Sequence, residues 1–339
     1  MDMREIAKIA GVSSATVSRV INGSNLVRPD TAERVRQVIR ETKFVPNGSA
    51  TTLKYGRSSS YGLIVPDMTN PFFAEFVRCF EGILVAKRQD MLMALTDHQA
   101  ARMQDTIHRM LVRQVDGVAL LASEIETEPI ETLIRNRVPL VTMDRRIIGQ
   151  GLSDVSINYL TGITEAVNHL KQLGHAKIAY IGGSSGLTIS DHRVNAFAKA
   201  LEAANLKVDP RYLVPGNYRI NGGEAAMAEI LAMTDRPTAI LAANDLTAIG
   251  ALQALRAAGL SAPKDISIVG FDDIEFCNVL DPPLTTIRLP RQELAEKFAT
   301  ALESSARDPH QPGKSYRVKT SLVIRASTAT ARKGNASRP

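Results

Sequence analysis

The sequence predicts a small all-α head with a helix-turn-helix, followed by a two-lobed α/β body built from doubly wound parallel sheets. Three observations support this fold class. Two short amphipathic helices meet at a glycine within the first 25 residues. Strands and amphipathic helices then alternate from residue 61 onward, in two successive series. Positive charge is concentrated in the head.

The first helix is predicted to begin after Asp2, because Glu5 follows at the spacing of a capping box. Its apolar stripe comprises Ile6, Ile9 and Ala10. Gly11 suits the left-handed turn that ends the helix, and Val12 is expected to fill the corner before the next one.

Ser13 is suited to cap a second helix, which is followed by a third from Arg28-Pro29-Asp30 to about Lys43. The residues predicted to face inward are Val17, Val20, Ile21, Val35, Val38 and Ile39. The residues left facing outward near the start of the second helix are Ser14, Ala15, Ser18 and Arg19. In a helix-turn-helix this is the surface that meets base edges, so double-stranded DNA is a predicted partner.

The charge distribution agrees with that partner. Residues 1–57 hold ten Lys or Arg and five Asp or Glu, a net charge of +5, and the last nine residues add +3. The 273 residues between them sum to −2. A basic head on a near-neutral body indicates a polyanion met by the head alone, although a merely solubilising surface would have the same charge.

The segment VPNGSATTLKYGRSSS separates head from body and is rich in Ser, Thr and Gly, as linkers are. In the body, the predicted strands are 61–67, 91–97, 116–123, 139–144, 153–158, 177–183, 239–245, 266–273 and 321–327. The predicted helices are 73–88, 102–114, 129–136, 160–173, 190–204, 222–233, 246–258 and 290–304.

Ligands of open parallel sheets bind beyond the carboxyl ends of the strands. The residues that follow predicted strands, or occupy comparable loops, include Asn70, Phe72, Phe73, Asp144, Arg145, Arg193, Tyr218, Asn244 and Asp272. Carboxylates, amides and guanidiniums pair with hydroxyl groups, and aromatic rings stack on a sugar's C–H face, so the set suits a polyhydroxylated ligand. Asp245 and Asp273 also follow strands, but capping of the next helix is the favoured interpretation for them.

Several functions are not expected. No run of eighteen apolar residues and no apolar leader are present, so a cytoplasmic location is expected. Cys79 and Cys277 are expected to be buried, reduced thiols, and the six histidines lack metal-ligand spacing. We find no nucleophile elbow and no phosphate-binding Lys beside the Gly-Ser loop, so no enzyme activity and no cofactor are expected.

The sequence resembles the lactose-repressor family of bacterial transcription regulators from residue 3 to about 328. The matching stretches include IAKIAGVSSATVSRVING, DMTNPFF, PLVTMDRR, LGHAKIAYIGG, AANDLTAIGAL, SIVGFDDI and LVIRAST. The body also resembles periplasmic sugar-binding proteins, most closely those that bind ribose. These resemblances imply a head at 1–46, a hinge at 47–58 and an effector and dimerisation domain at 59–330. Within the body they imply an N-lobe (about 59–158 and 289–319) and a C-lobe (about 159–288 and 320–330). The basic tail at 331–339 is expected to be disordered, as chain ends often are.

The resemblance implies a homodimer on a pseudo-palindromic operator, with one recognition helix in each major groove. The residues implied to contact bases are Ser14, Ala15 and Arg19, and Arg19 is implied to hydrogen-bond to the edge of a guanine. Phosphate contacts fall to Ser13, Thr16, Ser18 and Asn22, and Asn47 is counted with the DNA-binding residues. Leu53 would wedge into the minor groove beside Lys54 from a hinge that folds on DNA. Gly48 disfavours that hinge helix by about 1 kcal/mol.

The nine strand-end residues from Asn70 to Asp272 fall on the family's sugar-contact positions. Leu289 stands where a Gln is common, so one polar contact differs. The function implied is a repressor of carbohydrate genes whose operator binding responds to a monosaccharide or sugar derivative. Two alternatives stay open at this point: a ligand that acts as co-repressor, and a solute-binding protein with no DNA role.

Overall fold

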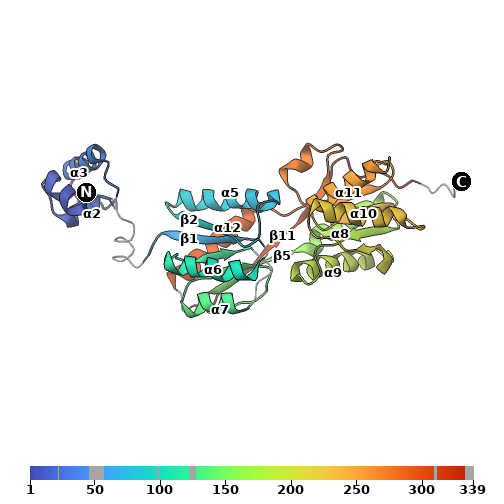
Figure 1. Cartoon of the computed structure of the whole chain (residues 1–339), viewed down its shortest axis with the longest axis horizontal. Coiled ribbons are helices and arrows are strands. Elements are labelled where there is room, and N and C mark those ends of the chain that lie inside the picture. Colours follow the sequence, from blue (N-terminus) through green and yellow to red (C-terminus); the bar gives the residue numbers. More distant parts are fainter. Residues whose placement is uncertain (22, 46–56, 98, 122–126, 309–310, 333–339) are drawn as a thin grey trace. The chain divides into compact units, whose positions relative to one another are not determined.

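The computed structural model describes residues 1–21, 23–45, 57–97, 99–121, 127–308 and 311–332. The chain divides into two compact units, residues 1–58 and 59–339. The described residues of the first unit form three helices, α1 (Met3–Ala10), α2 (Ser14–Ile21) and α3 (Pro29–Thr42) (Figure 1).

The capping box at the start of α1 is confirmed. The Asp2 carboxylate accepts hydrogen bonds from the backbone N–H groups of Arg4 and Glu5, at 2.7 and 2.9 Å, and the Glu5 carboxylate accepts one from Asp2 N–H at 2.8 Å. Gly11 ends the helix at φ +63°. Local sequence therefore sets both ends of the first helix.

The inward face of α1 differs from the predicted stripe. Ile6 and Ala10 are buried, but Ile9 is 55% exposed and Ala7 is buried in its place. Ile6 and Ala10 lie one turn apart on the buried face of α1, and Ala7 and Ile9 flank that face on opposite sides. Helices α2 and α3 pack against the side that carries Ala7, which leaves Ile9 exposed.

Gly11→Ala is expected to destabilise the head by about 1 kcal/mol, because the site offers space for a methyl group but requires a left-handed backbone. Urea unfolding, followed by NMR signals of α1 to α3, measures this. Gly82→Ala is the matched control, since it has equal space within a regular helix and should stabilise the body by a similar amount. Equal effects of the two substitutions would contradict the role of backbone strain at Gly11.

The second unit holds two lobes, each with a six-stranded sheet. The N-lobe sheet has the order β11-β5-β4-β3-β1-β2 and is wholly parallel. Its strands are β1 (Ser60–Val65), β2 (Asp90–Leu95), β3 (Val118–Leu120), β4 (Leu140–Met143), β5 (Leu152–Asn158) and β11 (Ser315–Lys319). Its helices are α5 (Pro71–Ala86), α6 (Ala100–Val112), α7 (Thr127–Arg135) and α12 (Arg291–Arg307).

The C-lobe sheet has the order β12-β10-β9-β8-β6-β7, with β12 antiparallel to β10 at one edge. Its strands are β6 (Ile178–Ile181), β7 (Leu213–Val214), β8 (Ala239–Ala242), β9 (Ser267–Asp272), β10 (Thr285–Arg288) and β12 (Ser321–Val323). Its α-helices are α8 (Tyr159–Gln172), α9 (Thr188–Ala203), α10 (Ile220–Ala232) and α11 (Asp245–Ala257). Two 3₁₀ turns, η1 (Pro210–Tyr212) and η2 (Glu275–Asn278), complete the lobe.

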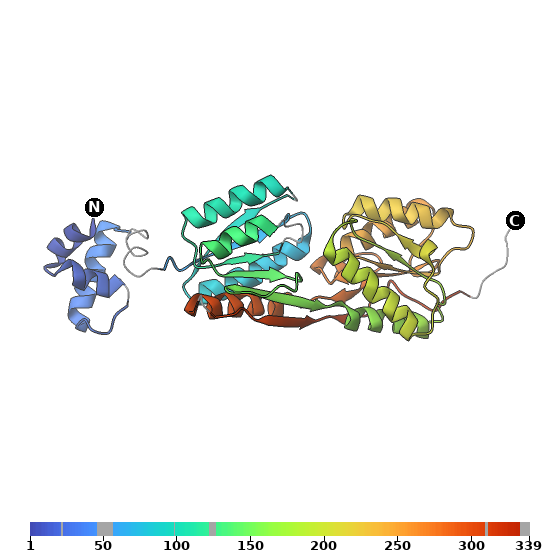
Figure 2. The same cartoon turned by 90° about the horizontal axis from the view of Figure 1, so that it is seen from below.

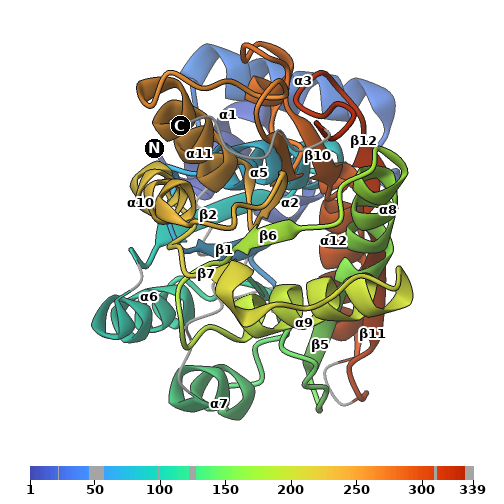
Figure 3. The same cartoon turned by 90° about the vertical axis from the view of Figure 1, so that its right-hand side faces the viewer.

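Helices cover both faces of each sheet. In the N-lobe, α5 and α12 pack together on one face, and α6 and α7 lie on the other (Figure 1). In the C-lobe, α8 and α9 cover one face, and α10 and α11 the other (Figure 3). Every helix predicted in the body is present, and the doubly wound class is confirmed.

Three strands of the structure were not predicted from the sequence: β7, β10 and β11. The first has two residues, and the other two, with sequences TTIR and SYRVK, carry more polar than apolar side chains. Only Val318 of β11 is buried, because this strand lies at the edge of its sheet. An edge strand shows little of the apolar pattern by which strands are recognised.

Three connections join the lobes: β5 to α8, β10 to α12, and β11 to β12. Strands β5 and β11 run side by side toward the C-lobe (Figure 2). The Thr320 hydroxyl donates to Asn158 O at 2.8 Å and accepts from Gly162 N–H at 3.0 Å, so it ties the third connection to the first. At the end of the body, Ala331 N–H bonds to Leu173 O and Arg332 pairs with Asp265, so these first two residues of the predicted tail are attached to the C-lobe.

No helix among the described residues is long and apolar enough to cross a membrane. Within the same residues, no group of three or more His, Cys, Asp or Glu side chains is placed to hold a metal ion. Cys277 is buried and Cys79 half-buried, and both are free thiols.

Candidate functional site

The start of α2 presents the polar surface expected of a recognition helix. Ser13 caps it, since its hydroxyl accepts from Thr16 N–H at 3.2 Å. Ala15 and Arg19 are exposed and Ser14 is half-buried. The Arg19 guanidinium forms no ion pair with any residue in the described parts of the chain, so it remains available for a ligand of the head.

The prediction that Ser18 faces outward is wrong, because its side chain is buried, with only 8% of the residue exposed. Helices α1 and α3 both pack against α2, and the face they bury is wider than the apolar stripe that the sequence marks. Four predicted DNA contacts lie outside the described residues: Asn22, Asn47, Leu53 and Lys54.

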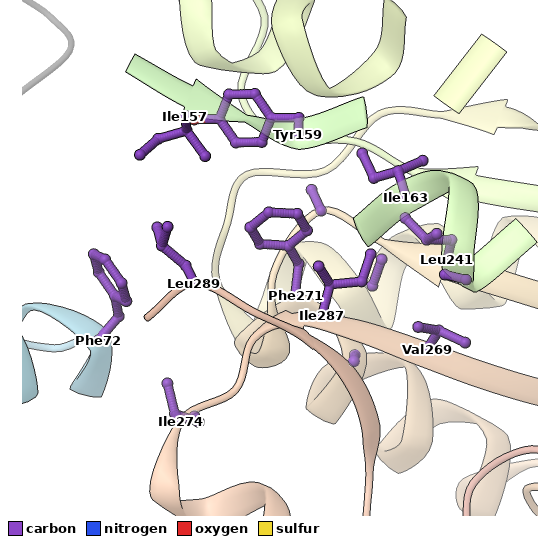
Figure 4. Packing of buried hydrophobic residues seen from close by; sticks show 14 of the residues in the cluster. Phe72, Ile157, Tyr159, Ile163, Leu241, Val269, Phe271, Ile274, Ile287 and Leu289 are labelled. Carbon is purple, nitrogen blue, oxygen red and sulfur yellow. The ribbon is translucent and has the colours of Figure 1, made fainter. Parts of the chain in front are cut away.

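A cavity of about 290 Å³ lies between the lobes, where strand ends of both sheets meet. Seven of the nine predicted effector residues line it: Asn70, Phe72, Phe73, Arg193, Tyr218, Asn244 and Asp272. It lies at the carboxyl ends of β1 and β3 in the N-lobe, and of β6 and β8 in the C-lobe. These are the points where each strand order reverses, as expected for open α/β sheets. Its apolar wall continues the core shared by the lobes, in which Phe72, Leu289, Tyr159 and Phe271 are seen (Figure 4).

Arg193 is the central charged group of this cavity. It is 5% exposed, and its guanidinium lies 4.1 Å from the centre of the Phe271 ring and 5.2 Å from that of Tyr159. One nitrogen pairs with the Asp272 carboxylate at 3.5 Å, and another donates to Ala243 O. Its buried Nε–H has no hydrogen-bond partner, which leaves one strong donor free for a ligand.

Asn70 and Asp272 bring the two lobes together across the cavity. Asn70 caps α5, accepting from Phe72 N–H at 3.0 Å, and its side chain lowers the pKa of Asp272 by stabilising the charged carboxylate. Asp272 is the last residue of β9 and has a φ of +114°, a strained backbone that aims its carboxylate at Arg193. The site therefore depends on contacts between residues about 200 positions apart.

Asn244 and Tyr218 hold each other in place. The Asn244 side-chain oxygen caps α11 at Thr247 N–H (2.9 Å), while its nitrogen donates to Tyr218 O at 2.9 Å. The Tyr218 ring packs over Gly183, where a Cβ would lie 2.0 Å from Tyr218 Cζ. The Gly-Ser loop thus makes room for an aromatic ring.

Asp144 and Arg145 do not line the cavity. Asp144 is buried, and its carboxylate accepts from His192 Nδ1 at 2.9 Å and from Ile157 N–H at 3.2 Å. Arg145 N–H donates to Asp154 at 3.0 Å, and burial lowers the pKa of its guanidinium. Asp144 thus faces β5 and α9, and Arg145 lies beside Asp154 of β5.

Asp245 and Asp273 do not cap helices, contrary to the favoured interpretation. Asp245 is fully buried and accepts from Ile274 N–H at 2.9 Å and from the Thr286 hydroxyl at 2.5 Å. Asp273 pairs with Arg288 and Arg325, at 2.6 Å each. Asn244 occupies the cap position instead.

Burial raises the pKa of Asp245 and of Asp272, and the nearby Asp272 carboxylate raises the pKa of Asp245 further. The two therefore titrate as a pair. For Asp272, Arg193 and Asn70 partly offset this effect by stabilising the charged form.

Sequence reasoning missed several residues that line the cavity, among them Asp67, Thr69, Tyr159, Asn217 and Arg219. Asp67 lies two residues after β1, and Arg219 directly follows Tyr218, so both could have been found from their neighbours. Arg219 and Asp67 form an ion pair at 3.6 Å between the lobes.

Residues 2–47 match the model of bacterial regulatory proteins of the lacI family, and residues 167–328 match a periplasmic binding protein-like domain. The ribose operon repressor of Haemophilus influenzae is 32% identical over 96% of this chain and 98% of its own length. This chain belongs to the lacI family. The repressor CytR of Escherichia coli K12, another relative, is 33% identical over 96% of both chains.

Solved structures agree with this lacI-family assignment. The lac repressor dimer bound to operator and the anti-inducer ONPF has a TM-score of 0.85 and 25% identity, over 97% of this chain and 99% of that one. A lacI-family regulator from Enterococcus faecium with bound ribose has a TM-score of 0.72 and 29% identity, over 80% of this chain and 100% of that one. The predicted family, the fold and the role as a DNA-binding transcriptional regulator are confirmed, so a solute-binding protein without a DNA role is excluded.

Proposed function

We propose that this lacI-family regulator is a homodimeric repressor whose operator affinity is set by a monosaccharide or sugar derivative bound between its lobes. The observation that carries the effector site is the buried Arg193, with one free donor, held between an Asp272 carboxylate and three aromatic rings. Sugar hydroxyls both donate and accept, so they can use the guanidinium and the carboxylate together. Relatives named for the ribose operon and structures holding ribose or cellobiose support this ligand class.

The lobes offer the means of coupling the two sites. Asn70 of one lobe stabilises the charged carboxylate of Asp272 in the other, and Asp67 pairs with Arg219 across the cavity. A ligand hydroxyl that inserts between the two residues of either pair breaks their direct contact between the lobes and hydrogen-bonds to both residues instead. The relative stability of two lobe arrangements then depends on the ligand, which is the requirement for allosteric control of DNA affinity.

In the head, we assign base reading to Arg19 with Ser14 and Ala15, and phosphate contacts to Ser13 and Thr16. The support is their position at the exposed start of α2 and the free guanidinium of Arg19. Paired heads of a dimer would each place this surface in a major groove.

One experiment tests the proposal as a whole. The operator is first selected from a random duplex library with the full chain, and its affinity is then measured by fluorescence anisotropy with and without ribose, cellobiose and a wider sugar panel. We expect at least one sugar to raise the thermal unfolding temperature and to change operator affinity tenfold or more. The direction of that change distinguishes an inducer from a co-repressor. A panel that changes neither quantity would contradict the proposal.

Effector affinity is also expected to fall as the pH is lowered from neutral. Burial raises the pKa of Asp272, so this carboxylate takes up a proton at milder acidity than usual and then accepts fewer hydrogen bonds. Affinity is therefore full above the raised pKa and falls by up to about tenfold per pH unit below it. Isothermal titration across pH 5 to 8 measures this, and a flat profile would contradict it. Asp272→Asn should abolish the pH dependence along with most of the affinity.

A further inference from the structure

A second cavity between the lobes has a different chemistry. It has a volume of about 460 Å³ and is lined by Arg146, His192, Lys199, Arg317, Ser156 and Tyr159, among others; we call it the basic groove. Four of these side chains are or can be cationic, and no Asp or Glu lines the groove. This concentration of charge stands out in a body whose net charge is −2.

The cations come from both lobes. Arg146 follows β4 and Arg317 lies on β11, both in the N-lobe, whereas His192 and Lys199 lie on α9 of the C-lobe. Lys199 and Arg317 are exposed, and neither forms an ion pair with any residue that the structure describes. Arg146 forms one long ion pair, in which its Nε lies 3.9 Å from Asp144 Oδ1. Their charges are thus left almost uncompensated by the protein.

A buried carboxylate behind the groove is already engaged. Asp144 is buried behind the groove and accepts the Nδ1 hydrogen bond of His192, which orients the imidazole. Both Asp144 and Arg146 have a left-handed backbone, with φ of +59° and +58°. This strained loop supplies an arginine to the groove and holds the histidine opposite it.

We infer that the basic groove binds a small phosphorylated metabolite that carries at least two negative charges. A single carboxylate would leave two or more of the cations unneutralised. A phosphate group offers two charges and oxygens that match the guanidinium fork of Arg146 or Arg317. The Ser156 hydroxyl and the amide of Asn195 can bond to the rest of such a molecule.

The groove adjoins the effector cavity. Tyr159 lines both cavities, is 3% exposed, and its hydroxyl makes no hydrogen bond of regular geometry. Along α9, His192 faces the groove and the next residue, Arg193, faces the effector cavity. An anion held by Arg317 and Lys199 would bridge the lobes and stabilise the lobe arrangement seen here. This inference does not depend on the identity of the proposed sugar.

Isothermal titration of the full chain with glucose 6-phosphate, inorganic pyrophosphate and uncharged glucose tests this site. We expect a phosphorylated probe to bind with a Kd of about 1 mM or tighter, and the Lys199→Gln/Arg317→Gln variant to bind it at least tenfold more weakly. Lys264→Gln/Arg236→Gln carries the same charge change at exposed positions elsewhere in the C-lobe and should bind like the wild type. If pyrophosphate binds as well as glucose 6-phosphate, the phosphate alone is recognised; if it binds more weakly, the sugar moiety contributes.

Three further variants locate the bound anion. Arg146→Gln alone should weaken binding severalfold, and it keeps the test valid if the double variant fails to fold. Arg219→Gln in the effector cavity and Arg19→Ala in the head should each leave anion binding unchanged. Loss of binding in either of these two, retention in Lys199→Gln/Arg317→Gln, or no binding of any phosphorylated probe by the wild type would overturn the inference.

Discussion

Replacing Arg193 with methionine is expected to lower affinity for the sugar effector at least 100-fold and to abolish the response of operator binding to it. The substitution removes the free Nε donor and leaves Asp272 buried without its cationic partner. An uncompensated buried carboxylate costs about 3–5 kcal/mol, so the C-lobe should also be less stable. Titration calorimetry and chemical unfolding measure the two effects separately.

A double variant separates binding from folding. In Arg193→Met/Asp272→Asn the carboxylate that loses its cationic partner in the single variant is replaced by a neutral amide, so stability should recover by several kcal/mol relative to the single variant. Effector affinity should not recover, because both polar groups proposed to hold the hydroxyls are gone. Operator binding without effector should stay near the wild-type level in the double variant. Normal release of DNA by the sugar in both variants would show that Arg193 is not an effector contact.

Arg19→Ala is expected to reduce discrimination between the operator and unrelated DNA by about 10–100-fold. A bidentate contact from arginine to guanine is worth about 1–3 kcal/mol, and α2 presents Arg19 without an internal partner among the described residues. Anisotropy titrations with operator and scrambled duplexes at one salt concentration measure the ratio.

Arg36→Ala is the matched control for the head. It removes the same charge from α3, where Arg36 pairs with Glu33 at 3.4 Å, and it should affect both duplexes alike. Sugar binding by the lobes should be unchanged in both variants. An unaltered operator preference in Arg19→Ala would remove Arg19 from the base-reading surface.

Local sequence patterns were enough to place most elements of this fold. The capping box at Asp2, the turn at Gly11 and each body helix follow from residues within a few positions of one another. Strand ends also predicted seven residues that line the effector cavity, because parallel strands deliver their carboxyl ends to one edge. Edge strand β11 was missed since its burial is one-sided and its residues are mostly polar.

The remaining features depend on which strand ends face each other across the lobes. Asp144 lies at the carboxyl end of its strand as Asp272 does, yet it binds His192 of α9 and does not line the effector cavity. Asp245 has the sequence position of a cap, yet it is buried beneath Asp272 with Thr286. In the same way, four cations scattered from Arg146 to Arg317 become one groove only after two lobes are assembled.

By itself, then, the sequence determined the family, the class of each domain and the helices that carry its two sites, because these follow from contacts within a few residues. Only the tertiary structure decided which strand-end side chains share a cavity, which carboxylates lie buried as a pair, and where uncompensated positive charge gathers. The physical reason is that burial and electrostatic pairing depend on residues tens to more than a hundred positions apart, whose distances are set by the packing of whole lobes.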